Sequence, residues 1–168
     1  MVSTADTLFN ISGFLDASYS WNVTCNDSSG KNGSSEIRIF NIDTHPPEFQ
    51  SLVTVPSDEA NLDPNANITA LANVTDNTTS VQTVILQYKL SNNSEFTNLT
   101  LPLYSNSNLY NNSFNATQNG TYNLRLWAND SVGNAAFSNL INIGVVLEKN
   151  WTRTPVSFPA VRTTLNSN

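Results

Sequence analysis

The stretch YNLRLWANDSVGN, residues 122–134, indicates the fold of this chain most directly. From Tyr122 to Ala128 its apolar residues alternate with polar ones, which is the period of a β-strand with one face in a core. The polar residues that follow are of the kinds that form tight turns. We therefore predict a strand that ends in a turn, with a partner strand in FSNLINIGVVL, residues 137–147.

The same pattern occurs about a hundred residues earlier, in YSWNVTCNDSSGKN, residues 19–32. An offset of 103 residues places Tyr19 on Tyr122. A matching partner strand is expected downstream, in EIRIFNID, residues 36–43. Two matching hairpins predict two related domains.

Two adjacent prolines separate the repeats, in DTHPPEF, residues 43–49. Proline fixes φ and lacks a backbone N–H, so a strand ladder cannot continue through this segment, which is interpreted as a short, stiff linker. Strands are expected after it at residues 49–55, 66–75, 81–91, 96–104, 109–116, 120–129 and 136–147. These short strands, separated by polar turns, predict an all-β fold, an antiparallel β-sandwich.

The expected organisation is one complete domain preceded by a partial one. Residues 47–148 are predicted to form the complete sandwich. Residues 1–46 hold only three strand candidates, TLFNISGF, ASYSWNVTC and EIRIFNI, and three strands cannot close a core alone. They are interpreted as the C-terminal part of a sandwich that earlier residues or a neighbouring subunit complete. Residues 149–168 are expected to be a tail, a linker or a donated strand.

Asparagine dominates the composition, with 27 asparagines beside 38 serines and threonines. Independent placement would give roughly six N-x-Ser/Thr triplets, the acceptor motif for N-glycosylation. The chain has 14, none with proline in the middle position. The predicted glycosylation sites are Asn10, Asn22, Asn26, Asn32, Asn67, Asn73, Asn77, Asn92, Asn98, Asn111, Asn115, Asn119, Asn129 and Asn150. The alternative is a secreted surface that is rich in these residues without being glycosylated.

The positions of these triplets agree with the predicted strands, because side chains in a strand alternate between two faces. If Tyr19, Trp21 and Val23 point into a core, Asn22 points to solvent. All seven triplets that fall within predicted strands lie on the polar face by this test, and the other seven lie in turns or at strand ends. Either alternative places the protein outside the cell.

Charge and hydropathy exclude two classes of partner. Only 12% of the residues are charged and the net charge is −6, so no basic face is available for nucleic acid. No apolar run approaches the roughly 20 residues of a membrane span, so no membrane insertion is expected.

The two hairpins resemble the end of Ig-like repeat domains that occur in tandem in archaeal and bacterial cell-surface proteins. The resemblance lies in YSWNVTCNDSSGKN followed by RIFNIDTHPPEF, and in NGTYNLRLWANDSVGNAAFSN (residues 119–139), and it covers residues 8–148. The abundance of N-x-Thr is similar to that of archaeal surface glycoproteins. The resemblance implies an Ig-like sandwich and a structural or adhesive role in an S-layer, a filament or an adhesin stalk.

The function expected is that of an extracellular, heavily N-glycosylated structural subunit of a cell-surface filament or layer. Self-association through sandwich domains is expected, and residues 155–165 are a candidate donor strand, although Pro155 and Pro159 argue against it. The alternatives are an adhesin or carbohydrate-binding module and a stalk domain of a larger surface protein.

No enzyme is expected, because titratable groups that could converge are few. His45 is interpreted as a linker residue, and the adjacent Asp58 and Glu59 as part of a solvated loop. No nucleophile-elbow, zinc-protease, C-x-x-C or phosphate-loop motif occurs.

No cofactor besides N-linked glycans is expected, with calcium as a minority hypothesis. Acidic residues occur near predicted loop ends, and calcium takes six to eight oxygen ligands. Carboxylates and carbonyls at an interdomain seam could supply them, while the alternative is that each Asp bonds its own turn. The residues concerned are Asp43, Asp58, Glu59, Asp63, Asp76 and Asp130.

Aromatic residues and the single cysteine complete the candidates. Trp21, Tyr88 and Tyr122 are predicted to face the core. Trp127 is expected to face outward and, like Trp151, is a candidate surface contact. Cys25 is expected to form a disulfide with a cysteine outside this chain or in a neighbouring subunit, as is usual in an oxidising environment.

Overall fold

The computed structural model describes residue 8 and residues 10–57, 62–104 and 107–146. Every regular element in these residues is a β-strand, and all strand pairs are antiparallel. The predicted all-β, antiparallel class is therefore confirmed. The described residues contain no helix long and apolar enough to cross a membrane.

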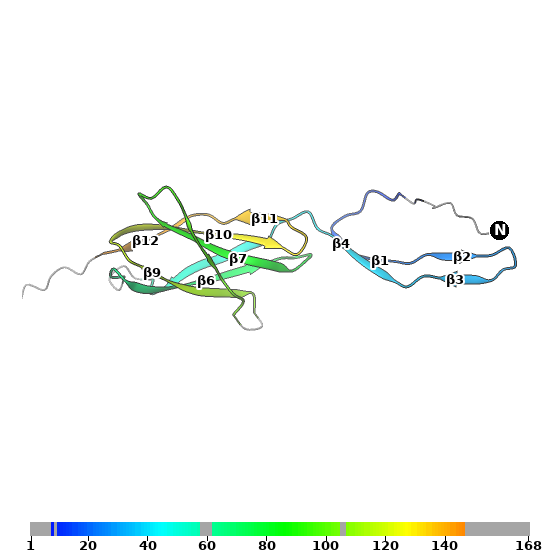
Figure 1. Ribbon diagram of the computed structural model, residues 1–168, viewed down its shortest axis with the longest axis horizontal. Coiled ribbons are helices and arrows are strands. Elements are labelled where there is room, and N and C mark those ends of the chain that lie inside the picture. Colours follow the sequence, from blue (N-terminus) through cyan, green and yellow to red (C-terminus); the bar gives the residue numbers. More distant parts are fainter. Residues whose placement is uncertain (1–7, 9, 58–61, 105–106, 147–168) are drawn as a thin grey trace, which may run out of the picture.

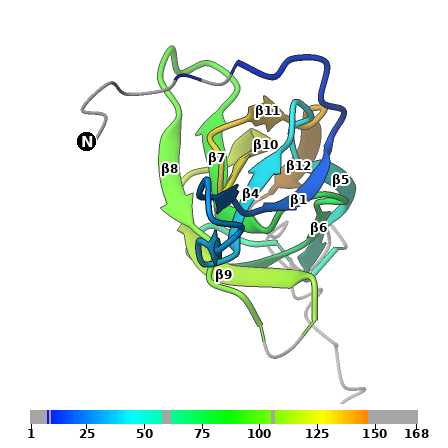
Figure 2. The same ribbon diagram turned by 90° about the vertical axis from the view of Figure 1, so that its right-hand side faces the viewer.

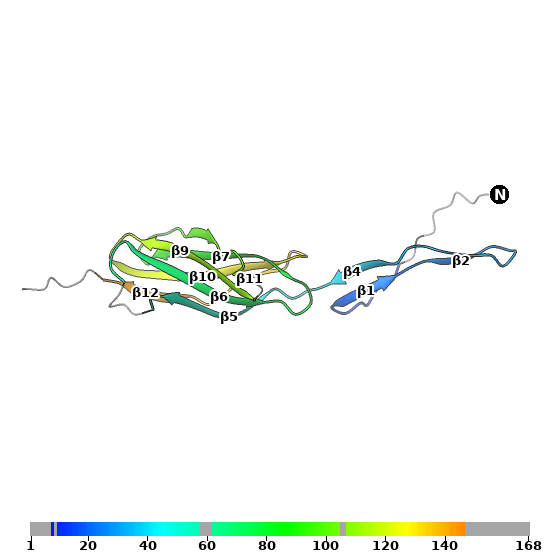
Figure 3. The same cartoon turned by 90° about the horizontal axis from the view of Figure 1, so that it is seen from below.

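An N-terminal hairpin occupies residues 17–42. It consists of β1 (Ala17–Trp21), β2 (Thr24–Asn26), β3 (Asn32–Ser34) and β4 (Arg38–Ile42). β1 pairs with β4, and β2 with β3, so two long arms are each interrupted once. Figures 1 and 3 show this hairpin extending away from one end of the rest of the molecule.

The following residues form a sandwich-like body of two facing sheets, which we call the two-sheet unit (residues 48–146). One sheet has the order β5-β6-β9, and the other has β11-β10-β7-β8 with β12 also paired to β10. The strands are β5 (Glu48–Val55), β6 (Ala66–Thr75), β7 (Val81–Leu90), β8 (Thr97–Thr100), β9 (Leu109–Ala116), β10 (Gly120–Asp130), β11 (Ala135–Phe137) and β12 (Ile141–Val145). Figure 2 looks along the unit from the hairpin end.

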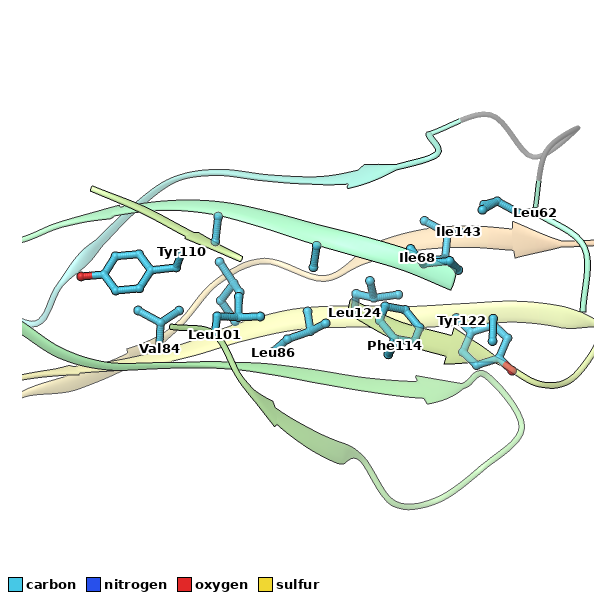
Figure 4. Close-up of a cluster of buried hydrophobic side chains, with 14 of the residues drawn as sticks. Leu62, Ile68, Val84, Leu86, Leu101, Tyr110, Phe114, Tyr122, Leu124 and Ile143 are labelled. Atoms are coloured by element: carbon cyan, nitrogen blue, oxygen red, sulfur yellow. The ribbon is translucent and has the colours of Figure 1, made fainter. Parts of the chain in front are cut away.

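Alternating apolar side chains from both sheets make one core (Figure 4). On β6 the inward residues Ile68, Ala70, Ala72 and Val74 are all fully buried, as their spacing predicts. Tyr122 is also buried on β10, which confirms its predicted core position. Tyr88 is half-buried and stacks on Phe114 at 4.2 Å between ring centroids.

Two predicted strands are interrupted, each for a local reason. The segment 96–104 keeps strand geometry only over Thr97–Thr100, since Pro102 cannot donate to a ladder. Leu103 lies beyond this strand and is 55% exposed. The segment 136–147 divides into β11 and β12 around Ser138, whose Oγ accepts the Leu126 N–H at 2.8 Å.

The hairpin repeats the β10–β11–β12 segment in the same register. Tyr19 faces Phe40 as Tyr122 faces Ile143, at the predicted offset. The interruption is also repeated, because Ser35 Oγ accepts the Val23 N–H at 2.9 Å, as Ser138 does for Leu126. The prediction of two matching hairpins is therefore confirmed.

Within residues 1–46 one expected strand is wrong, and the apolar face expected on the hairpin is uncovered in this chain. Residue 8 and residues 10–14 form no strand, although TLFNISGF was expected to be one, and Ile11 is 71% exposed. Trp21 and Val23 point to the same side of the hairpin, yet 46% and 45% of their surfaces are exposed. Alternation gives the side chains a common face, but no second sheet within the described residues covers it.

Candidate functional site

Three polar turns meet where the hairpin joins the two-sheet unit, and we call this region the seam. They are the linker after β4, the β6–β7 turn and the β10–β11 turn, which contribute Asp43, Asp76 and Asp130 respectively. One carboxylate oxygen from each aspartate lies within 4.8 Å of the others. Asp130 is completely buried, whereas Asp43 and Asp76 are half-buried.

Asp130 organises the β10–β11 turn. Its Oδ1 accepts the backbone N–H groups of Val132, Gly133 and Asn134 at 2.9, 2.6 and 2.9 Å. Gly133 has a φ of +102°, a left-handed conformation that suits glycine. Burial raises the pKa of the Asp130 carboxyl, but the hydrogen bonds from Asn134, Gly133 and Val132 outweigh it and hold this pKa below its usual range.

Asp76 and Asp43 are connected by Thr79. The Asp76 Oδ1 accepts the N–H groups of Thr78 at 3.1 Å and Thr79 at 2.7 Å, which closes the β6–β7 turn. The Thr79 hydroxyl donates to Asp43 Oδ2 at 2.7 Å. A carboxylate of the linker is thereby tied to the two-sheet unit.

Asn134 makes a second connection across the seam. Its Nδ2 donates to Asp130 Oδ2 at 2.7 Å and to the backbone carbonyls of Asp43 at 3.0 Å and His45 at 3.3 Å. One amide group therefore joins the β10–β11 turn to the linker.

The three aspartates of the seam suit a hard cation. Three carboxylates converge there without an ion pair to lysine or arginine among the described residues. Oxygen donors of this kind are those calcium prefers. Beside them a hollow of about 230 Å³ opens between the linker and the β6–β7 turn. Three of the six acidic residues proposed from the sequence are thus brought together.

The other acidic candidates lie elsewhere. Asp63 precedes β6, at the opposite end of that strand from Asp76. Asp58 and Glu59 lie outside the described residues.

His45 lies in the linker, as expected, and its ring contacts Asp16, the residue before β1. Its Nδ1 is 2.5 Å from Asp16 Oδ2. Asp16 also accepts the Thr44 N–H at 3.1 Å. That backbone hydrogen bond lowers the pKa of Asp16, whereas burial raises it. The contacts from His45 and the Thr44 hydroxyl also lower this pKa, so the net shift is downward. The ring is 80% exposed, and His45 lines the hollow beside the seam.

The sequon asparagines lie mainly at the surface. Of the thirteen that the structure describes, ten are exposed: Asn10, Asn22, Asn26, Asn32, Asn67, Asn77, Asn92, Asn98, Asn115 and Asn119. Asn73, Asn111 and Asn129 are half-buried, and the Oδ1 atoms of Asn73 and Asn129 are buried without a hydrogen-bond partner. Asn150 lies outside the described residues.

Trp127 lies on the outer face of the β7–β10 sheet, paired across the strands with Phe137. The guanidinium of Arg125 lies 4.3 Å from the centroid of Phe137 and 4.5 Å from that of Phe96. This cation therefore lies against two rings of the same chain. Trp127 itself is half-buried, and Trp151 lies outside the described residues.

Cys25 is an exposed free thiol on β2. It lies opposite Gly33, at the position that Ala128 occupies in β10. The expected disulfide partner outside this chain stays a prediction.

Four residues of the seam and the hairpins were missed from the sequence. Asn134 and Thr79 act through side-chain hydrogen bonds to residues of other turns, for which a linear pattern gives no signal. Ser35 and Ser138 could have been found, because they occupy equivalent positions at the repeat offset. A serine repeated at one position of two strands indicates a shared interruption.

Comparison with known proteins adds no family. No family model and no curated protein matches the chain. Among the solved structures similar to it is the crystal structure of an engineered protein, with 19% sequence identity and a TM-score of 0.41. The similarity covers 61% of this chain and 20% of that protein.

Proposed function

We propose that this chain is a structural segment of an extracellular, heavily N-glycosylated surface filament or layer, built of Ig-like β-sandwich repeats. The observation that carries the proposal is the exposure of the sequons. Ten of the thirteen described acceptor asparagines are exposed and none is fully buried. A set of acceptors this dense and this accessible suits a surface that glycans keep soluble and protect from proteases.

The architecture supports a mechanical role. The hairpin projects from one end of the two-sheet unit (Figure 1), and hydrogen bonds from Thr79 and Asn134 hold the linker against the unit. Repeats joined in this way act as stiff units in line. Copies associate through β-sandwich domains, with strand addition at an open sheet edge. The candidate donor strand at residues 155–165 lies outside the described residues.

The test is the mass and the assembly of the chain produced in a glycosylating archaeal host. We expect an intact mass well above the bare 18.4 kDa, sugars on several exposed sequons by glycopeptide mapping, and regular polymers in negative stain. A mass near 18.4 kDa would remove the glycoprotein proposal. Saturable binding of the monomer to a glycan array, without polymers, would favour an adhesin instead.

A further inference from the structure

The N-terminal hairpin has an unpaired edge at the position where its repeat is paired. In the two-sheet unit, β10 pairs with β7 from Tyr122 to Asp130. The equivalent arm of the hairpin is β1 followed by β2, and among the described residues these strands pair only with β4 and β3. The backbone on the other side of this arm therefore has no strand partner within the described residues.

The same arm borders an uncovered apolar hollow of about 830 Å³. Trp21 and Val23 line it with exposures of 46% and 45%, whereas their equivalents Leu124 and Leu126 are fully buried. No residue that lines the hollow carries a charge. Side chains that enter it must therefore be uncharged, because burying an unpaired charge beside apolar groups is costly.

We propose that the open edge of β1–β2 is an acceptor site for an antiparallel β-strand with the chemistry of β7. The strand belongs to a separate polypeptide of the same repeat type, and it is apolar at alternate positions. This interface already exists once in the molecule, between β7 and β10, on a hairpin with the same register and the same serine interruption. The inference rests on the proposed function for the claim that such repeats meet.

The hydrogen bonds also fix which residues of the incoming strand bind the edge. The Leu126 N–H and C=O both bond Ser138, on the β11 side, so the backbone of Trp127 faces β7. The Val23 N–H and C=O bond Ser35 in the same way, so Thr24 faces the open edge. The incoming strand must therefore bond through its outward-pointing residues, as β7 does, and place its inward residues toward the hollow.

This rule disfavours residues 155–165 as the antiparallel donor. If Phe158 points toward the hollow, Pro155 and Pro159 occupy positions that must donate an N–H to the edge, and proline has none. The β7 sequence has no proline, and its inward positions hold Val84, Leu86 and Leu90.

The test is a titration of the full chain with a synthetic peptide of residues 80–91, SVQTVILQYKLS, which lacks tryptophan. Trp127 and Trp151 are replaced by Phe, so that the tryptophan fluorescence of the chain comes from Trp21 alone and reports binding at the hollow. We expect a saturable blue shift of its fluorescence. N-methylation of the peptide at Thr83, Ile85 and Gln87 should abolish the shift, whereas N-methylation at Val84, Leu86 and Tyr88 should preserve it.

A pair of variants makes the assignment specific. Val23→Asp should weaken binding about tenfold or more, because it places a charge in the apolar hollow. Ile39→Asp, on the opposite face of the hairpin where Ile39 is 71% exposed, should leave binding within about twofold, since the new carboxylate stays hydrated. Circular dichroism of each variant shows whether the strands are retained.

The proposal is overturned by absence of saturable binding, by equal loss with both N-methyl patterns, or by tighter binding of a peptide of residues 155–165. Polymers in negative stain together with any of these results would leave the proposed function standing and remove only this acceptor site. Peptide binding by an unglycosylated chain that forms no polymers would support the acceptor site and remove the proposed function.

Discussion

At the residue scale, the two repeats contain the same aspartate in different surroundings. Asp27 Oδ1 accepts the N–H groups of Ser29 and Lys31 at 2.8 and 2.9 Å. The repeat-equivalent Asp130 accepts three backbone N–H groups in its turn. Asp27 is exposed and Asp130 is completely buried. The sequence gives both residues one conformational role, and burial decides how much free energy each contributes.

Replacing the buried aspartate should destabilise the two-sheet unit. Asp130→Ala removes a buried carboxylate and leaves three part-buried N–H groups without their acceptor, and we expect the free energy of unfolding to fall by about 2–3 kcal/mol. Asp27→Ala, the matched control, exposes its N–H groups to water and should leave this unfolding free energy within about 0.5 kcal/mol of the original. Urea unfolding followed by near-ultraviolet circular dichroism measures both. Equal effects from the two variants would refute the role of burial.

The lowered pKa of Asp130 also predicts a pH dependence. A carboxyl whose folded pKa is depressed contributes stability above its unfolded pKa, and that stability is lost as pH falls through the folded pKa. We therefore expect the unfolding midpoint in urea to drop below about pH 4, the ordinary range of an aspartate. The drop should be smaller in Asp130→Asn. The same acid profile in both proteins would assign the effect to other carboxyls.

At the element scale, serine interrupts two strands and replaces part of the ladder. Ser138 separates β11 from β12, and its hydroxyl both accepts the Leu126 N–H and donates to the Asn139 carbonyl at 3.0 Å. Ser35 makes the equivalent pair of bonds, to Val23 and Glu36. The hydroxyl allows the strand to bend without an unpaired donor, which explains why one predicted strand is observed as two.

Removing the hydroxyl should matter only where the strand is buried. Ser138→Ala leaves the N–H of the buried Leu126 without an acceptor, and we expect a loss of about 1–2 kcal/mol in unfolding free energy. Ser35→Ala removes the same bond from an exposed hairpin, where water replaces it. Thermal unfolding of the two variants provides the comparison. A Ser138→Ala protein as stable as the original would show that the hydroxyl is dispensable.

At the scale of the whole molecule, the hydrogen bonds of the seam restrict the orientation of the hairpin relative to the two-sheet unit. Asn134 bonds carbonyls of the linker, and its repeat equivalent is Lys31, at the distal end of the hairpin. Asn134→Ala should therefore widen the range of orientations of the hairpin relative to the two-sheet unit. Spin labels on the exposed Cys25 and on a cysteine introduced at Ser80 would report this as a broader distance distribution. Lys31→Ala should leave the distribution unchanged, and an unchanged width in Asn134→Ala would contradict the prediction.

Calcium at the seam stays a prediction from the sequence, now attached to Asp43, Asp76 and Asp130. If they bind calcium, about 1 mM of the ion, a range typical of extracellular sites, should raise the melting temperature of the chain. A chelator should reverse the rise, and Asp76→Asn should remove it, whereas Asp27→Asn should preserve it. No change in melting temperature on adding calcium would remove the hypothesis.

The sequence by itself determined the strands and their inward faces. Alternation from Ile68 to Val74 and from Tyr122 to Ala128 specified which side chains the core contains, because a strand has a period of two residues and turn residues mark its ends. The repeat at an offset of 103 residues also predicted two matching hairpins, which share one register in the structure.

Only the tertiary structure decided which of these apolar faces is covered. Trp21 and Leu124 follow the same pattern, yet one is 46% exposed and the other is fully buried, since burial depends on a second sheet that residues far away in the sequence supply. The seam has the same origin. Asp43, Asp76 and Asp130 come from three separate turns and converge only when β6, β7 and β10 align their ends. Local sequence patterns specify the conformation of a segment and the strand face on which each side chain lies. Contacts between segments that are distant in the sequence form only in the folded chain.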